Sequence, residues 1–310
     1  MSDNKKHYPL NRLLVALDTS EMDEVLMRTA AQMTERFPIQ KIYFLYVSRR
    51  LELPEEVLNK YPDLAPADET VEYNLKERWK QHAPSNSNLE VEIEAVEGNP
   101  VDRLLRWVKT KKIDLLMMGR KTNLKGSGSI PNKLVKVAPC SILFVPENIS
   151  NTFKRILVPI DYSEHSRFAL EKGVQLGKSC DATLICQNVF VIPSGYHTTG
   201  KSREEFSEIM KENAEREYQH FMSSVDLEGV STEVIFEEND DNDPADEIYN
   251  RALDSKADLI ILGSKGRKGL SSLLLGSVAS RVLEFAKSVP VLVVKEKDEG
   301  LSFLQALLRL

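Results

Sequence analysis

A glycine-punctuated segment near the carboxyl end of the chain has the residue types of a phosphate-binding loop. It runs from Gly263 through Gly266 to Gly276 and Ser277, after an apolar run and before a helical pattern. Glycine lacks Cβ, so its backbone can approach a ligand closely, and the free N–H groups at a helix start favour an anion. Positive charge is supplied by Lys265, Arg267 and Lys268. On composition alone, a turn followed by a helix cap explains the segment equally well.

A second phosphate-type pattern lies at Gly195 to Ser202, which spells G-x-x-x-x-G-K-[ST]. A P-loop enzyme would also need an aspartate at the end of a later strand, but Asp258 begins its apolar run. Three interpretations stay open: a polar loop before a helix, a flap over a nucleotide bound elsewhere, and a true P-loop. We favour the polar loop.

The sequence contains an internal repeat that covers most of its length. The segment RLLVALDTSE begins at Arg12 and RILVPIDYSE begins at Arg155, 143 positions later. The segments that begin at Asp114 and Asp258, DLLMMG and DLIILG, lie 144 positions apart. A nearly constant offset over about a hundred residues indicates duplication of a whole domain. We therefore expect domains over 1–147 and 153–297.

Each copy alternates short apolar runs with helical patterns, which predicts an α/β fold with a parallel sheet. Strands are expected near 12–17, 41–47, 89–96, 114–118 and 141–145, and in the second copy over 155–160, 181–192, 231–238, 258–263 and 289–294. Ligands in such sheets bind beyond the carboxyl ends of strands where the strand order reverses. The loops to watch in the second copy therefore carry Asp161 and the Gly263–Ser277 segment.

The spacing Gly-x2-Gly-x9-Gly-Ser, the string GSKGRKGLSSLLLGSVASRVL and the opening ILVPIDYSE resemble the ATP-binding universal stress proteins. The resemblance covers both copies. It implies two tandem five-stranded, doubly wound domains of the adenine-nucleotide alpha-hydrolase-like type. Relatives of this kind commonly dimerise through their last strand, so the resemblance further implies an intramolecular pseudo-dimer or a homodimer, with strands 141–145 and 291–295 at the contact.

The resemblance also implies a site for ATP, with or without Mg or Mn. By this likeness Asp161 and the backbone at Val189 would hold the adenine and ribose end. The phosphates would lie at Gly263, Gly266, Gly276 and Ser277. The remaining residues expected around the nucleotide are Pro159, Ile160, Leu262, Arg267 and Val278.

The first copy departs from this signature. It keeps Asp18 and Gly119, but Thr122 stands where the second glycine should be. Gly119 to Gly128 spans 9 positions, against 13 from Gly263 to Gly276. A loop that is four residues shorter cannot wrap a triphosphate in the same way, so we expect weak nucleotide binding or none in this copy.

Composition limits the remaining functions. A net charge of −6 gives no general attraction to nucleic acid or to anionic membranes. The apolar run Leu13 to Leu17 is too short for a signal peptide. Scattered Cys140, Cys180 and Cys186 suit a reducing cytoplasm and are expected to be buried as small apolar residues. Trp79 and Trp107 lie in helical patterns and are expected to pack in the core. The acidic run 237–243 is expected to be a solvated loop.

The favoured function is a cytoplasmic stress-response module, regulatory or sensory, that binds ATP in its second domain. A slow metal-dependent ATPase that uses Asp161 and a ligand-independent scaffold are the alternatives. A last segment, 298–310, places Leu301, Leu304, Leu307 and Leu308 on one helical face. We expect an amphipathic helix there, docked on the chain's own core, on a partner, or on a membrane.

Overall fold

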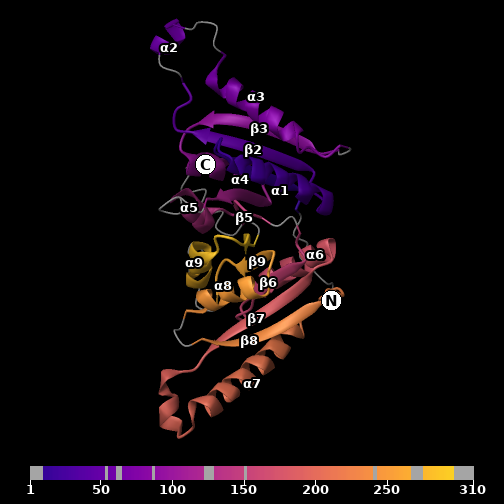
Figure 1. The fold of residues 1–310 in the computed structure, drawn as a ribbon, viewed down its shortest axis with the longest axis vertical. Coiled ribbons are helices and arrows are strands. Elements are labelled where there is room, and N and C mark those ends of the chain that lie inside the picture. The colour runs from indigo at the N-terminus through magenta and orange to yellow at the C-terminus, as the bar shows by residue number, and fades with distance from the viewer. Residues whose placement is uncertain are drawn as a thin grey trace. The chain divides into compact units, whose positions relative to one another are not determined.

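The computed structural model describes residues 10–52, 55–60, 65–85, 88–121, 129–149, 152–239, 243–266 and 275–296. The chain forms two compact units that divide between Glu147 and Asn148, and each unit is described by itself (Figure 1). The predicted helix over 298–310 lies outside the described residues.

The first unit alternates strands and helices in the predicted order. Its elements are β1 (Arg12–Leu17), α1 (Met22–Arg36), β2 (Lys41–Ser48), α2 (Glu55–Lys60), α3 (Ala67–Lys80), β3 (Glu90–Glu97), α4 (Pro100–Thr110), β4 (Leu115–Arg120), α5 (Ser129–Val137) and β5 (Ser141–Pro146).

The second unit repeats this order with one added 3₁₀ helix. Its elements are β6 (Arg155–Pro159), α6 (Glu164–Cys180), β7 (Thr183–Val191), η1 (Ser194–Thr199), α7 (Arg203–Met222), β8 (Thr232–Asn239), α8 (Pro244–Asp254), β9 (Leu259–Gly263), α9 (Ser277–Phe285) and β10 (Val291–Val294).

Each unit has a parallel sheet whose strand order reverses after its first strand. The order is β3-β2-β1-β4-β5 in the first unit and β10-β9-β6-β7-β8 in the second. All described pairs within each unit are parallel. The reversal places the ends of β1 and β4, and those of β6 and β9, at switch points of doubly wound sheets. The predicted fold class is confirmed.

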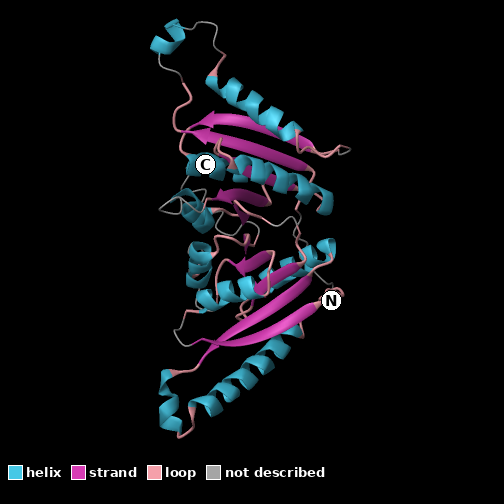
Figure 2. Ribbon diagram, viewed as in Figure 1, coloured by secondary structure: helices cyan, strands magenta, loops and turns pink. Residues whose placement is uncertain are grey.

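Helices cover both faces of each sheet (Figure 2). Tyr43 and Phe44 are neighbours on β2, so their side chains point to opposite faces. Tyr43 packs edge-on against Trp107 of α4, with centroids 5.8 Å apart, and Phe44 lies 4.8 Å from Trp79 of α3. Both tryptophans are under 10% exposed, as predicted.

Central strands are buried on both faces, which explains their unbroken apolar runs. Ile156, Leu157 and Val158 of β6 are all fully buried. All three cysteines are buried and free, as predicted. The expectation for the acidic run was wrong in part: Glu237 and Glu238 lie within β8, where Glu237 pairs with Arg251 of α8.

An aspartate fixes the start of the first strand in each unit. Oδ2 of Asp258 accepts the backbone N–H groups of Lys154 (2.8 Å) and Arg155 (3.0 Å). Asp114 does the same for Asn11 and Arg12, at 3.0 Å each. These carboxylates lie at the amino ends of the strands, away from the switch points. Asp258 is therefore a structural residue and does not occupy the place of a P-loop enzyme's metal-binding aspartate.

Replacing Asp258 with Ala should destabilise the second unit by about 2 kcal/mol, because two backbone donors lose a charged acceptor. Urea denaturation measures this difference. The exposed Asp254, at the end of α8, offers a control: Asp254→Ala should change stability by less than about 0.5 kcal/mol. Equal effects of the two substitutions would contradict the assigned role.

Candidate functional site

The loops that follow β6 and β9 meet in the second unit. The two strands pair directly, with Ile156 opposite Leu259 and Leu157 opposite Ile260. Because parallel strands end at the same edge of a sheet, Asp161 after β6 lies beside the segment Ser264 to Gly266 after β9. The structure thus brings together the two loops that the sequence selected.

A tight turn directs the carboxylate of Asp161. Its Oδ1 accepts hydrogen bonds from the backbone N–H of Ser163 (3.1 Å) and from the Ser163 hydroxyl (2.6 Å). Ser163 also caps α6. Tyr162 between them has φ of 65°, an uncommon value outside glycine, and its hydroxyl donates to the Ala214 carbonyl of α7 at 2.7 Å. The anchored tyrosine holds the turn that presents Asp161.

Gly266 lies directly against that carboxylate. A methyl group at position 266 would lie only 2.5 Å from Oδ2 of Asp161. Gly263 is equally restricted, because its methyl group would lie 2.6 Å from the carbonyl oxygen of His165 in α6. Close approach to backbone requires glycine at 263. At 266 a methyl group would instead have to displace the Asp161 carboxylate, the polar group expected to reach a ligand.

The start of α9 joins the same cluster. The N–H of Gly276 donates to the Ser264 carbonyl at 2.9 Å, and a methyl group at 276 would lie 3.3 Å from the Cα of Lys265. Gly276 is the N-cap of α9, which begins at Ser277. The two ends of the loop therefore meet, and the first-turn amides of α9, which lack intrahelical partners, lie near the Lys265–Gly266 backbone. This arrangement suits an anion.

Val189 presents backbone groups at the same end of the sheet. In β7 the N–H of Thr183 donates to the Lys154 carbonyl before β6, and the Gln187 carbonyl accepts from the N–H of Ile160 after β6. The N–H of Leu184 donates in the other direction, to the carbonyl of Ser231 just before β8. Odd-numbered residues of β7 thus direct N–H and C=O toward β6.

Val189 follows the last ladder pair, Pro159 with Gln187. Its N–H and C=O therefore point beyond the end of β6.

The other predicted site residues occupy different depths. Pro159 ends β6, and Ile160 and Leu262 are buried, at 3% and 4% exposure. Val278 is half-buried in the first turn of α9. Arg267 lies outside the described residues.

Two polar residues at this edge were missed by the sequence analysis. The Asn188 side chain donates to the Ile160 carbonyl at 2.8 Å in a buried contact. The hydroxyl of Ser264 is buried, with no hydrogen-bond partner in the described part of the chain. A signal was present for Asn188, since it interrupts an apolar strand sequence.

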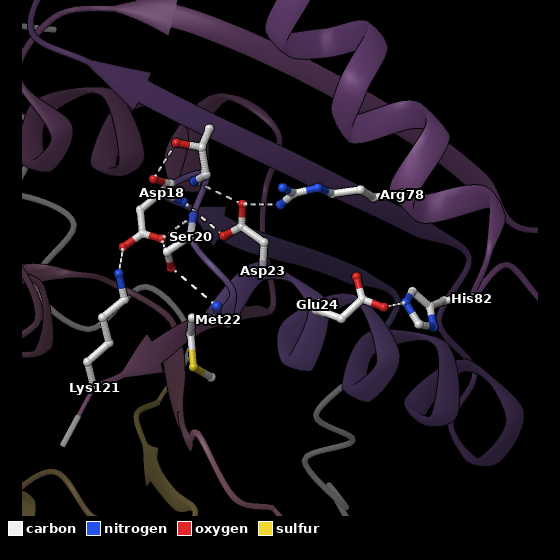
Figure 3. Close-up of polar contacts among 9 residues, drawn as sticks. Asp18, Ser20, Met22, Asp23, Glu24, Arg78, His82 and Lys121 are labelled. Carbon is white, nitrogen blue, oxygen red and sulfur yellow. Dashed lines mark hydrogen bonds and ion pairs between the residues drawn. The ribbon is translucent and has the colours of Figure 1, made fainter. Parts of the chain in front are cut away.

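In the first unit, Asp18 matches Asp161 and forms an ion pair with Lys121 (Figure 3). Nζ of Lys121, which follows β4, lies 2.6 Å from Oδ2 of Asp18, and Ser20 donates to the other oxygen. Burial alone would raise the pKa of Asp18, but hydrogen bonds from Lys121 and Ser20 hold it below its ordinary value. The carboxylate that matches Asp161 is thus engaged within the chain.

Asp23 of α1 binds the backbone of the loop that carries Asp18. It is fully buried, and its carboxylate accepts the backbone N–H groups of Asp18 (3.0 Å) and Thr19 (2.9 Å). Arg78 of α3 lies 4.0 Å away (Figure 3). Burial raises the pKa of Asp23 to about 6, against the hydrogen bonds that lower it. The second unit has Ser166 at this place in the repeat.

The segment from Gly195 to Ser202 matches the Walker A pattern and is called the Walker-like segment below; its geometry differs from that of a phosphate loop. Residues Ser194–Thr199 form the exposed helix η1, in which the Thr198 hydroxyl donates to the Gly195 carbonyl. Ser202 caps α7 and shares a capping box with Glu205. The segment is a polar connection before a helix, so the P-loop interpretation loses its structural basis.

Within the described ranges, no group of three or more histidine, cysteine or acidic side chains could hold a metal ion. No helix in the described part of the chain has the length and apolar character needed to cross a membrane.

The stability of the first unit should carry a pH-dependent contribution from Asp23. Its folded pKa is raised, so the folded state binds this proton more tightly than the unfolded state does. The contribution is fully present below about pH 4 and is lost as the pH rises through about 6. Across that range it amounts to about 3 kcal/mol.

The test compares the wild type with Asp23→Asn in urea denaturation between pH 4 and 7.5. The free energy of unfolding of the wild type should increase, relative to the variant, as the pH falls. The comparison cancels titrating groups that do not interact with Asp23. Asp18 does interact with it, but its lowered pKa places its own contribution mainly below pH 4. A constant difference between the two proteins across this range would contradict the role of Asp23.

Comparison with known proteins agrees with the duplicated architecture. The model of the universal stress protein family matches residues 9–146 and again 152–295. A universal stress protein of Methanocaldococcus jannaschii is 36% identical over 151 residues, which cover 48% of this chain and 86% of that protein. The universal stress protein E homolog of Haemophilus influenzae is 24% identical over 291 residues, 90% of each chain.

A solved structure extends the likeness to the whole fold. The crystal structure of a universal stress protein from Archaeoglobus fulgidus has a TM-score of 0.63 at 18% identity, and the match covers 92% of this chain and 98% of that one. Since the family model matches both halves, this chain belongs to the universal stress protein family and carries two of its domains in tandem.

Proposed function

We propose that the second unit binds ATP, one molecule per chain, and that the protein acts as a regulatory or sensory module of a cytoplasmic stress response. The observation that carries the proposal is the meeting of the Asp161 carboxylate, the Gly266 backbone and the start of α9 at the switch point between β6 and β9. Family membership supplies the stress-response setting.

The phosphate end of the proposed site uses backbone donors and one hydroxyl. The first-turn amides of α9 and the Ser277 side chain would bind phosphate oxygens, and the helix dipole would favour their charge. The contact of Gly276 with Lys265 and Gly266 leaves no room for a larger side chain without displacement. Mg or Mn would enter with the phosphates.

The adenine base would bind at the end of β7, at Val189. Val189 offers a donor and an acceptor directed beyond β6, which complement N1 and the amino group of adenine. A carboxylate such as Asp161 is suited to accept from ribose hydroxyls.

The first unit is proposed to bind no nucleotide. Thr122 stands in place of Gly266 and the loop to Gly128 is four residues shorter, so it could not wrap a triphosphate as the second unit would. Asp18 is also held by Lys121. For nucleotide binding in the second unit, a regulatory function is the one we propose. A slow ATPase stays the alternative, and turnover by the pure protein distinguishes the two.

Calorimetry should give one ATP per chain, and Gly266→Ala should weaken binding on the order of tenfold or more. The methyl group would displace the Asp161 carboxylate, which lies 2.5 Å from it. Gly276→Val should act similarly at the start of α9. As a matched control, Gly195→Ala in the Walker-like segment has open space around it and should bind ATP normally.

Substitution of the matching aspartates, Asp161 and Asp18, tests the two units separately. Asp161→Asn keeps the side-chain shape and should weaken ATP binding by about tenfold, as expected for the loss of one charged contact. Asp18→Asn should leave both affinity and stoichiometry unchanged. Two ATP molecules per chain, or equal sensitivity to the two substitutions, would contradict the proposed site.

We also propose that the two units associate as a pseudo-dimer. Within its own unit, β5 pairs with β4 and β10 pairs with β9, and each stands at one end of the strand order of that unit. Strand edges are usually paired or covered. A fragment of residues 152–296 should therefore self-associate in sedimentation experiments, and a folded fragment that stays monomeric at high concentration would contradict this proposal.

A further inference from the structure

The geometry points to Asn188 as the residue that sets the nucleobase preference of the second unit, because its side chain keeps the Val189 N–H out of the β6–β7 ladder. This inference rests on the proposed nucleotide site. Asn188 would not touch the phosphates or the ribose; it is a positioning residue that acts through Ile160 and Val189.

The first step is the partner of the Ile160 carbonyl. The N–H of Ile160 donates to the Gln187 carbonyl at 2.7 Å. In a regular parallel ladder, the Ile160 carbonyl would then accept from the N–H of Val189. Instead Nδ2 of Asn188 donates to it at 2.8 Å, in a contact where Asn188 is only 5% exposed. Among the described backbone hydrogen bonds, none joins Val189 to Ile160.

The first unit shows the alternative arrangement. Tyr46 stands where the second unit has Asn188, because Ala16 pairs with Leu45 as Pro159 pairs with Gln187. A tyrosine has no side-chain amide to offer a neighbouring carbonyl. The strand pairing in this unit continues for one more residue, to Leu17 and Tyr46, whereas that of β6 stops at Pro159.

The consequence for the base follows from donor and acceptor placement. An available Val189 N–H matches N1 of adenine, which is an acceptor. Hypoxanthine and guanine carry a hydrogen on N1 and would place donor against donor. Sites that hydrogen-bond a ligand reject an analogue that leaves their polar groups unpaired. Asn188 would therefore favour adenine over these bases.

The test uses Asn188→Leu, which keeps the volume and removes the donor. The Ile160 carbonyl would then take the Val189 N–H, as the ladder continues in the first unit. Calorimetry with ATP and inosine triphosphate should show ATP binding weakened about tenfold, the effect of one lost hydrogen bond, and inosine triphosphate binding changed by less than about twofold. Equal losses for both nucleotides would overturn the inference.

Two variants control for general damage to the core. Gln187→Met removes the neighbouring buried amide, which bonds to Glu237 and to the Glu247 carbonyl, and should leave the ratio of the two affinities unchanged. Asn188→His supplies a ring N–H at a similar reach and should restore the preference for ATP. If Asn188→Leu does not fold, Asn188→Ala removes the same donor.

A measurement without nucleotide separates this inference from the proposed function. Amide hydrogen exchange at Val189 should be slower in the folded donor-free variant than in the wild type, because the N–H becomes hydrogen-bonded. Unchanged or faster exchange would contradict the role of Asn188. Failure of the wild type to bind ATP would refute the proposed function, and the exchange comparison would still decide the role of Asn188.

Discussion

The approach of the loop after β9 to the carboxylate of Asp161 is the constraint on which the candidate site depends. A methyl group at position 266 would lie 2.5 Å from Oδ2 and would have to displace the carboxylate. The N–H of Gly276 then brings the start of α9 back to Ser264. A carboxylate, a glycine backbone and a helix start are thus held together by strand pairing, by the absence of two side chains, and by the Tyr162 and Ser163 contacts that hold the turn at Asp161.

The two units show how one turn can serve two purposes. Tyr162 and Thr19 occupy the same left-handed conformation, with φ of 65° and 62°, and each places an aspartate at the end of a central strand. In the second unit the carboxylate faces a glycine backbone. In the first it is engaged by Lys121 and supported by the buried Asp23. The duplicated fold is preserved, while the segment after the fourth strand of each copy differs in length and in glycine content.

A polar residue within a strand also affects the candidate site. Asn188 is buried in an apolar strand, and burial of an amide is unfavourable unless its hydrogen bonds are made. Its bond to Ile160 meets this requirement and also stops the ladder one residue early. A residue that stabilises the sheet in this way also changes which backbone groups are available at the sheet edge.

The sequence by itself determined the duplication, the order of strands and helices, the buried tryptophans and cysteines, and the two loops at the switch point. Those features follow from local periodicity and from an offset that any reader can count. Only the tertiary structure showed that Gly195 to Ser202 forms a helix and a cap. Its residue pattern matches a phosphate loop, but a residue pattern does not specify the backbone conformation. The tertiary structure also revealed the Asp18–Lys121 pair and the contact of Asn188 with Ile160. These join residues 103 and 28 positions apart, and such contacts exist only once the parallel strands have brought distant segments to one edge.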